Sequence, residues 1–240
     1  MLRFAEELPR SRRRIASDLA LPGMPRERAL ACAVRLLDRG SLRIGSEQYA
    51  EENETYGVST LQPGHVALDG PRMDFTFVGK GSITHERSIR DAAAADVIRR
   101  LKGRRGATGL LAYKTGRRWC EINAEQINAY VKEQVGPRFS AKDFRTWNGT
   151  VMAAIALAGL DPGDKRAVRT ATGIVAAHLG NTPAVCRKSY IDPRVIDRFL
   201  EGQVIGLRLP RLDRDQTAPR IGPAVERATL ELIADGSVAS

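Results

Sequence analysis

Cysteine and histidine are scarce in this sequence. The three cysteines, Cys32, Cys120 and Cys186, are far apart and odd in number, and the three histidines are equally scattered. This pattern favours neither a disulfide framework nor a paired-cysteine zinc site, and no Asp or Glu cluster with ligand spacing accompanies the histidines. We therefore expect a reduced, intracellular setting, no metal site, and histidines in structural or surface positions.

Long apolar runs are also missing. No run approaches the length that spans a bilayer, and the N-terminal stretch MLRFAEELPRSRRR lacks the continuous apolar region of a secretory signal. No internal repeat or long low-complexity segment is present either. We expect neither a membrane partner nor secretion.

Acidic residues are outnumbered. The chain has 38 Lys and Arg against 28 Asp and Glu, which gives a net charge of +10 and favours a polyanionic partner. The excess is local, since residues 80–118 contain eleven basic residues and three acids. A solvated helix face explains many charge runs, but a segment so poor in acids fits a phosphate-facing surface better.

Helical periodicity dominates the chain and predicts a mostly α-helical protein. Helices are predicted for residues 1–20, from Pro25 to Gly40, from Asp91 to Leu101, from Asn123 to about Gln134, from Ser140 through the apolar run GTVMAAIALAGL, from Asp164 to Leu179, from Pro193 through VIDRFLEG, and from Ala224 to Ala234. The run from Glu51 to Glu54 predicts a polar loop, and residues 203–221 predict a Pro- and Arg-rich connector.

Residues 58–89 have the punctuation of short strands. The words VSTL, HVAL, MDFTFV and SITHERSI, separated by the turns QPG and DGP, predict a small antiparallel sheet. Lys80 lies between two glycines at one tip, where the backbone can bend and the side chain can project. A phosphate-binding P-loop is excluded, because Asp74 and Gly81 stand where that motif needs Gly and Ser or Thr. The predicted fold class is α+β.

The stretch from Leu179 to Ile191 reads LGNTPAVCRKSYI and organises the functional interpretation. It ends a predicted helix, turns at Asn181, and then carries four polar residues on one short segment: Arg187, Lys188, Ser189 and Tyr190. A tyrosine after basic residues, nine positions past a turn-borne amide, suits a nucleophile aimed at a phosphodiester. For a tyrosine taken alone, a core residue beside solvated charges is the better interpretation, because groups of residues carry functional inference.

Arg145 lies in the word SAKDFRTW, at the polar end of a predicted core helix. Taken alone it is best interpreted as a buried, ion-paired arginine, since structural charge networks are common.

Four words of the sequence, in order and spacing, resemble the type IB DNA topoisomerases of the small bacterial and viral kind: SLRIGSEQYAEENETYGVSTL, FVGKGS, SAKDFRTW and LGNTPAVCRKSYI. The resemblance covers roughly residues 1–205. It implies a mostly helical catalytic domain with a small sheet, in the superfamily of the tyrosine recombinases. It also implies relaxation of supercoiled DNA through transient single-strand cleavage, a 3′-phosphotyrosine intermediate, strand rotation and religation.

The resemblance assigns roles to five residues. Tyr190 matches the nucleophile, Arg43 and Arg145 match the two catalytic arginines, and Lys80 matches the hairpin lysine that protonates the leaving oxygen. Asn181 stands where many relatives have histidine. An amide can still donate a hydrogen bond to a phosphoryl oxygen, but it brings no imidazolium charge.

Physical chemistry explains these residue types. A free phenol, with a pKa of about 10, is about one part in a thousand ionised at pH 7, so the cations Arg187, Lys188 and the two arginines would favour the attacking phenolate. Arginines offer paired donors to non-bridging oxygens, and a poor alkoxide leaving group needs a general acid. Nothing in this scheme requires a metal or a nucleotide, so we expect no cofactor.

The resemblance also implies double-stranded DNA as the partner, a monomer, and a bacterial cytoplasmic or nucleoid location. Candidate DNA-contacting residues are Lys142, Arg187, Lys188, Arg104, Arg105, Arg117 and Arg118. The expected organisation is a catalytic domain over residues 1–205, divided into 1–90 and 91–205, and a tail over 206–240 with a short helix. The β-rich domain that usually comes first is expected to be absent, which predicts weaker and less processive DNA binding.

Two alternatives remain open. A site-specific tyrosine recombinase would use nearly the same five residues, but KDFRTW lacks the usual His-x-x-Arg arrangement and no separate core-binding domain precedes Arg43. A basic DNA-binding module with an inactive site is the other, and for it a Tyr190→Phe change would alter nothing.

Overall fold

The computed structural model describes residues 1–206 and 221–234. The chain divides into two compact units, one formed by residues 1–6 with residues 145 onward, and the other by residues 7–144. Helices α1 (Leu2–Leu19) and α6 (Ala141–Ala158) each contribute to both units. Each unit is described by itself below.

The unit of residues 7–144 is organised around one buried helix. Besides most of α1, its helices are α2 (Arg26–Gly40), α3 (Glu47–Asn53), α4 (Ala92–Lys102) and α5 (Ala124–Gln134), with 3-10 turns η1 (Val58–Thr60) and η2 (Pro63–His65). Helix α2 begins after Pro25 and is followed by Ser41 in the left-handed region, and most of its residues are buried. It packs against α4, α5, β3 and β4, which confirms that the periodicity from Pro25 to Gly40 marks a core helix.

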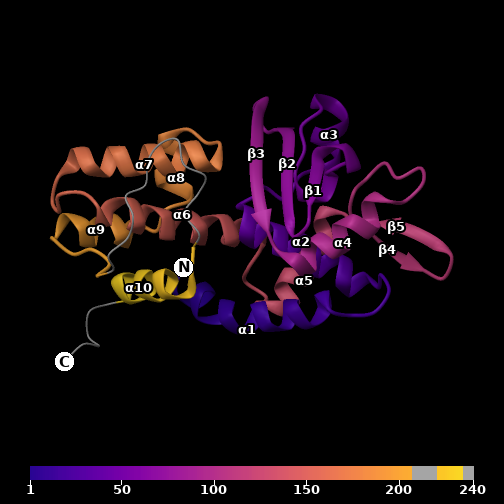
Figure 1. Ribbon diagram of the computed structural model, residues 1–240. Helices are drawn as coiled ribbons and strands as arrows, with labels where there is room; N and C mark the ends of the chain where they lie inside the picture. Colours follow the sequence, from indigo (N-terminus) through magenta and orange to yellow (C-terminus); the bar gives the residue numbers. More distant parts are fainter. Residues whose placement is uncertain (207–220, 235–240) are drawn as a thin grey trace. The chain divides into compact units, whose positions relative to one another are not determined.

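The predicted antiparallel sheet is present in this unit (Figure 1). Its strands are β1 (Val66–Asp69), β2 (Arg72–Gly79) and β3 (Ile83–Arg90), in that order. Strand β2 alternates buried Met73, Phe75 and Phe77 with more exposed residues, as a sheet with one face on a core requires. A separate hairpin is formed by β4 (Ala112–Thr115) and β5 (Arg118–Glu121).

Two sequence predictions in this unit are wrong. The segment from Glu51 to Glu54, predicted as a loop, contributes three residues to α3, which a Gln48 to Glu52 side-chain hydrogen bond of 3.0 Å supports across one turn. The word VSTL, predicted as a strand, contains η1. That turn forms because Thr60 bonds the backbone of Gly57 through both its N–H and its hydroxyl oxygen.

The unit that contains residues 145 onward is helical over its described residues. After α6 come α7 (Lys165–Leu179), α8 (Pro183–Ser189), α9 (Pro193–Leu200) and α10 (Pro223–Ile233). Asp164, Thr182 and Asp192 cap α7, α8 and α9, each accepting a backbone N–H. The predicted connector over 203–221 lies mostly outside the described residues. The overall prediction of a mostly helical α+β protein is confirmed.

Helices that could cross a membrane are absent from the described residues, because none is both long and apolar enough. Within the same ranges, no group of three or more His, Cys, Asp or Glu side chains is arranged to hold a metal ion.

Candidate active site

Arg145 and Tyr190, 45 positions apart in the sequence, lie together in one unit. The Arg145 side chain is buried, and its guanidinium carbon lies 5.2 Å from the centroid of the Tyr190 ring. One terminal nitrogen, Nη2, donates a 2.8 Å hydrogen bond to the carbonyl of Leu179 at the end of α7. The arginine therefore touches both the tyrosine and the turn that leads to it.

The turn between α7 and α8 explains how Tyr190 comes to lie near α7. Gly180 adopts the left-handed conformation, with φ 61° and ψ 49°, that ends a helix most easily when the residue is glycine. Asn181 then donates its backbone N–H to Ala176 at 3.0 Å, and Thr182 caps the next helix. Asn181 lies two residues beyond the Leu179 carbonyl that Arg145 binds, so Arg145 connects this turn with the Tyr190 ring at the end of α8.

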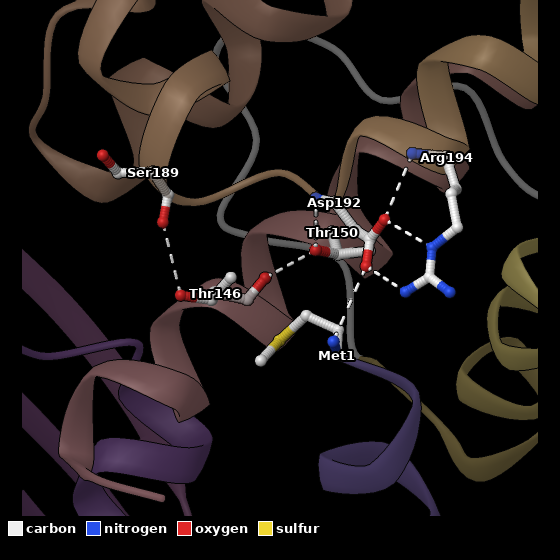
Figure 2. Close-up of polar contacts among 6 residues, drawn as sticks. All are labelled: Met1, Thr146, Thr150, Ser189, Asp192 and Arg194. Carbon is white, nitrogen blue, oxygen red and sulfur yellow. Dashed lines mark hydrogen bonds and ion pairs between the residues drawn. The ribbon is translucent and has the colours of Figure 1, made fainter.

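Three residues of α6 lie against the backbone on both sides of Tyr190: Thr146, Gly149 and Thr150. The hydroxyl of Thr146 donates to the Ser189 carbonyl at 3.4 Å, and the hydroxyl oxygen of Thr150 accepts the Asp192 N–H at 3.0 Å (Figure 2). At Gly149, a Cβ would lie only 2.4 Å from the carbonyl oxygen of Tyr190. The helix that carries Arg145 thus also supports the nucleophile candidate one turn later.

Asp192 extends this support to α9. Its carboxylate pairs with Arg194 at 2.6 Å, and lies 3.7 Å from the amino group of Met1 (Figure 2). Burial raises the pKa of the Asp192 carboxyl, but hydrogen bonds and the charge of Arg194, with a contribution from the amino group, outweigh burial and lower it overall. The carboxylate is therefore ionised at neutral pH and anchors the start of α9.

Cys186 lies one helical turn before Tyr190 and is fully buried. Burial raises the pKa of its thiol to about 11, although the charge of Arg145 acts in the opposite direction. The thiol is consequently neutral at physiological pH and serves as a small apolar packing group.

The two basic residues before Tyr190 are more exposed to solvent than the tyrosine. Arg187 and Lys188 are exposed and line a shallow groove between α8 and α9, together with Ala184, Ile191, Pro193, Ile196 and Asp197. Because residues advance by about 100° around a helix, Lys188 lies about 200° from Cys186. The sequence suggested that these two cations, with the two catalytic arginines, would favour the phenolate, and the structure has the guanidinium carbon of Arg145 at 5.2 Å from the ring centroid. Contact of Arg187 and Lys188 with DNA stays a prediction.

In the other unit, the backbone at Arg43 is held by a close approach of two glycines. The Arg43 carbonyl accepts the Val58 N–H at 2.9 Å. A Cβ on Gly57 would lie 2.4 Å from the nitrogen of Gly45, which itself has φ 93°. Neither position can hold a larger residue without strain, which explains both glycines near Arg43.

Lys80 is exposed at the tip of the β2 and β3 hairpin, followed by Gly81 with φ 79° and Ser82 with φ 56°. The N–H of Tyr56 donates to Val78 in β2 at 2.8 Å. Residues 56–58 therefore bond the Arg43 loop on one side and the Lys80 strand on the other. Arg43 and Lys80 are placed at the same end of their unit.

A row of rings supports the Lys80 hairpin, and sequence reasoning missed it. Adjacent ring centroids are 4.4 Å apart for Tyr56 and His65, 6.2 Å for His65 and Phe77, and 5.5 Å for Phe77 and His85. Burial lowers the pKa of His65. A Cβ on Gly79 would lie 2.4 Å from the His85 ring, so the ring occupies the space beside the glycine. Aligning the two predicted strands around the Lys80 tip would have revealed part of this row, since Phe77 and His85 are cross-strand partners.

The other predicted DNA-contacting residues are distributed over both exposed and structural positions. Lys142, Arg105, Arg117 and Arg118 are exposed. Arg104 instead donates to the carbonyls of Leu101, Gly109 and Leu110 and lies 5.2 Å from the Trp119 ring. Burial lowers the pKa of Arg104, and the charge of Glu121 opposes that shift. The structure gives Arg104 a role in holding its own loop.

The fold and the site together define a mostly helical α+β protein in which a buried arginine covers the ring of a tyrosine at the end of a short helix. Residues 1–201 match the family described as eukaryotic DNA topoisomerase I, catalytic core, and the chain belongs to that family. The predicted resemblance to type IB topoisomerases is confirmed.

Individual relatives agree with the family. The chain is 26% identical over 200 residues to a DNA topoisomerase 1B of Acanthamoeba polyphaga mimivirus, covering 78% of this chain and 60% of that protein. It is 25% identical over 163 residues to DNA topoisomerase 1 of rabbit fibroma virus, covering 65% and 49%. It is 31% identical over 126 residues to DNA topoisomerase 1 alpha of Arabidopsis thaliana, covering 52% and 13%. The chain thus spans 60% or less of the length of these curated relatives.

Proposed function

We propose that this protein is a type IB DNA topoisomerase, which relaxes supercoiled double-stranded DNA without ATP or a metal ion, acting as a monomer in the cytoplasm. One observation carries the proposal: the guanidinium of Arg145 lies 5.2 Å from the ring centroid of Tyr190, within a family of topoisomerase catalytic cores. A phenol next to a cation that can also bind phosphate is the pairing that tyrosine attack on a phosphodiester needs.

In the proposed step, the phenol oxygen of Tyr190 attacks phosphorus in line and releases its proton to solvent. The bond from phosphorus to the 5′ oxygen breaks, and a 3′-phosphotyrosine bond forms. Charge grows on the two non-bridging oxygens, and Arg145 and Arg43 each donate hydrogen bonds to them. By analogy with other preorganised donors, removing one such donor costs about a hundredfold to a thousandfold in rate.

Lys80 donates a proton to the departing 5′ oxygen, which would otherwise leave as a strongly basic alkoxide. Its position at an exposed hairpin tip supports this role, because the side chain can reach a bound strand. Asn181 donates a hydrogen bond to a non-bridging oxygen, a neutral replacement for the histidine of many relatives. The phosphotyrosine bond conserves the energy of the broken phosphodiester, so the free 5′ hydroxyl reverses the reaction after strand rotation.

The test is incubation of the protein with supercoiled plasmid in EDTA, followed by denaturation to trap a covalent protein–DNA adduct. We expect relaxation and an adduct from the wild type, and neither from Tyr190→Phe. Tyr113→Phe, which removes a hydroxyl from β4, is the matched control and should behave as the wild type. The absence of an adduct from the wild type would contradict the proposal. Joining of paired target sites without relaxation would indicate a recombinase.

A further inference from the structure

We propose that Thr150 is a positioning residue for the nucleophile: its buried hydroxyl holds the backbone beyond Tyr190 and so sets the phenol relative to Arg145. The inference rests on the proposed function, since it assigns Tyr190 the role of nucleophile. It concerns a residue that touches neither the reacting phosphate nor the phenol, and acts through the chain segment that carries the phenol.

The hydroxyl of Thr150 uses both its donor and an acceptor position. It donates to the Thr146 carbonyl at 2.7 Å and accepts the Asp192 N–H at 3.0 Å, with no exposure of the residue to solvent. A hydroxyl has one donor and two lone pairs, so both bonds form at once. The bond to Asp192 joins positions 42 apart and ties the segment after Tyr190 to α6.

Other buried threonines in the same unit make only part of the hydrogen bonding that Thr150 makes. Thr172 in α7 and Thr229 in α10 also donate to the carbonyl four residues earlier, at 2.7 and 2.8 Å. Such bonds stay within one helix and have no consequence for a neighbouring segment. Thr150 makes the same local bond and adds a bond to Asp192, as Figure 2 shows.

The consequence for Tyr190 follows from where the bonds fall. The Thr146 hydroxyl donates to the carbonyl just before Tyr190, and the Thr150 hydroxyl oxygen accepts the N–H two residues after it. Between them, a Cβ at Gly149 would lie 2.4 Å from the carbonyl oxygen of Tyr190. The same helix begins its second turn with Arg145, which covers the ring. A reacting group fixed in advance loses less freedom at the moment of attack, and a misplacement of about 1 Å can lower a rate by about a hundredfold.

The test compares Thr150→Val, which keeps the shape and removes the hydroxyl, with Thr150→Ser, which keeps the hydroxyl. The assay is single-turnover formation of the covalent adduct on a saturating duplex, with the duplex Kd measured separately. We expect Thr150→Val to lower the adduct rate constant by about tenfold to a hundredfold with an unchanged Kd, and Thr150→Ser to restore it to within about threefold. Thr229→Val, the matched control, loses a buried hydroxyl away from Tyr190 and should keep the wild-type rate.

A second measurement keeps the inference separate from the proposed function. Amide hydrogen exchange at Asp192 should be faster by about tenfold or more in Thr150→Val than in the wild type or Thr229→Val, because its acceptor is gone. A wild-type adduct rate in Thr150→Val would overturn the inference while leaving the proposed function intact. If the wild type formed no adduct, the proposed function would fail. Unchanged exchange at Asp192 in Thr150→Val would overturn the positioning role in either case.

Discussion

Replacing Gly149 with alanine tests the support of the nucleophile most directly. The added Cβ would lie 2.4 Å from the Tyr190 carbonyl oxygen, whereas ordinary contacts begin at 3.4 Å. The neighbouring atom belongs to the backbone and cannot rotate away, so the chain at Tyr190 must move by about 1 Å, a displacement that can cost about a hundredfold in rate. The Cδ1 of Leu179, at 3.2 Å, can adjust through its side chain.

Gly149→Ala should change the free energy of unfolding only modestly, although it slows adduct formation strongly. Overpacking costs about 1–3 kcal/mol, and the better helix propensity of alanine returns about 1 kcal/mol. The net free energy of unfolding should therefore fall by about 0–2 kcal/mol, and the variant should remain folded. A normal circular dichroism spectrum together with a hundredfold slower adduct formation is the expected combination.

The matched control for Gly149→Ala is Gly173→Ala. Gly173 lies inside α7, and a Cβ there would meet nothing within 4 Å. This change should stabilise the protein by about 0.5–1 kcal/mol and leave the adduct rate unchanged. Single-turnover adduct assays and thermal unfolding measure both quantities. A folded Gly149→Ala variant that formed the adduct at the wild-type rate would refute the argument that α6 sets the position of Tyr190.

Three further predictions concern individual side chains. Lys80→Ala should slow adduct formation on ordinary duplex by about a hundredfold to ten-thousandfold. It should not slow the reaction on a duplex with sulfur at the bridging 5′ position, because a thiolate leaves without protonation. Equal slowing on both substrates would contradict a general-acid role. Asn181→His should retain plasmid relaxation, since both side chains donate a hydrogen bond, and complete loss would show that this residue is misassigned. Asp192→Asn should lower the free energy of unfolding above about pH 4, the usual pKa of an unfolded aspartate. The pKa of Asp192 is lowered in the folded protein, which means that the ionised carboxylate is the form that stabilises the fold. That difference should disappear as the pH falls through the folded pKa, and urea unfolding at pH 7 and pH 3 measures it; an equal difference at both values would contradict the assigned shift.

Local patterns were enough to predict much of the fold. The apolar spacing from Pro25 to Gly40 marks α2, and the caps Asn123 and Asp164 mark the starts of α5 and α7. The glycines around Lys80 predicted the hairpin tip. These signals are local, because a helix or a tight turn is determined largely by residues within a few positions of one another. The loop prediction for the segment from Glu51 to Glu54 was wrong because it relied on local charge alone, whereas most of the segment continues α3.

The candidate site divides in the same way. The sequence by itself determined the residue types and their order, and its motifs were sufficient to select Tyr190 and Arg145 as candidates. Only the tertiary structure decided that Arg145 covers the Tyr190 ring, that Arg104 binds its own loop, and that Thr150 bonds Asp192. Those contacts join positions far apart or depend on which way a helix faces. No local period encodes them, because they follow from how packed helices align their side chains in three dimensions.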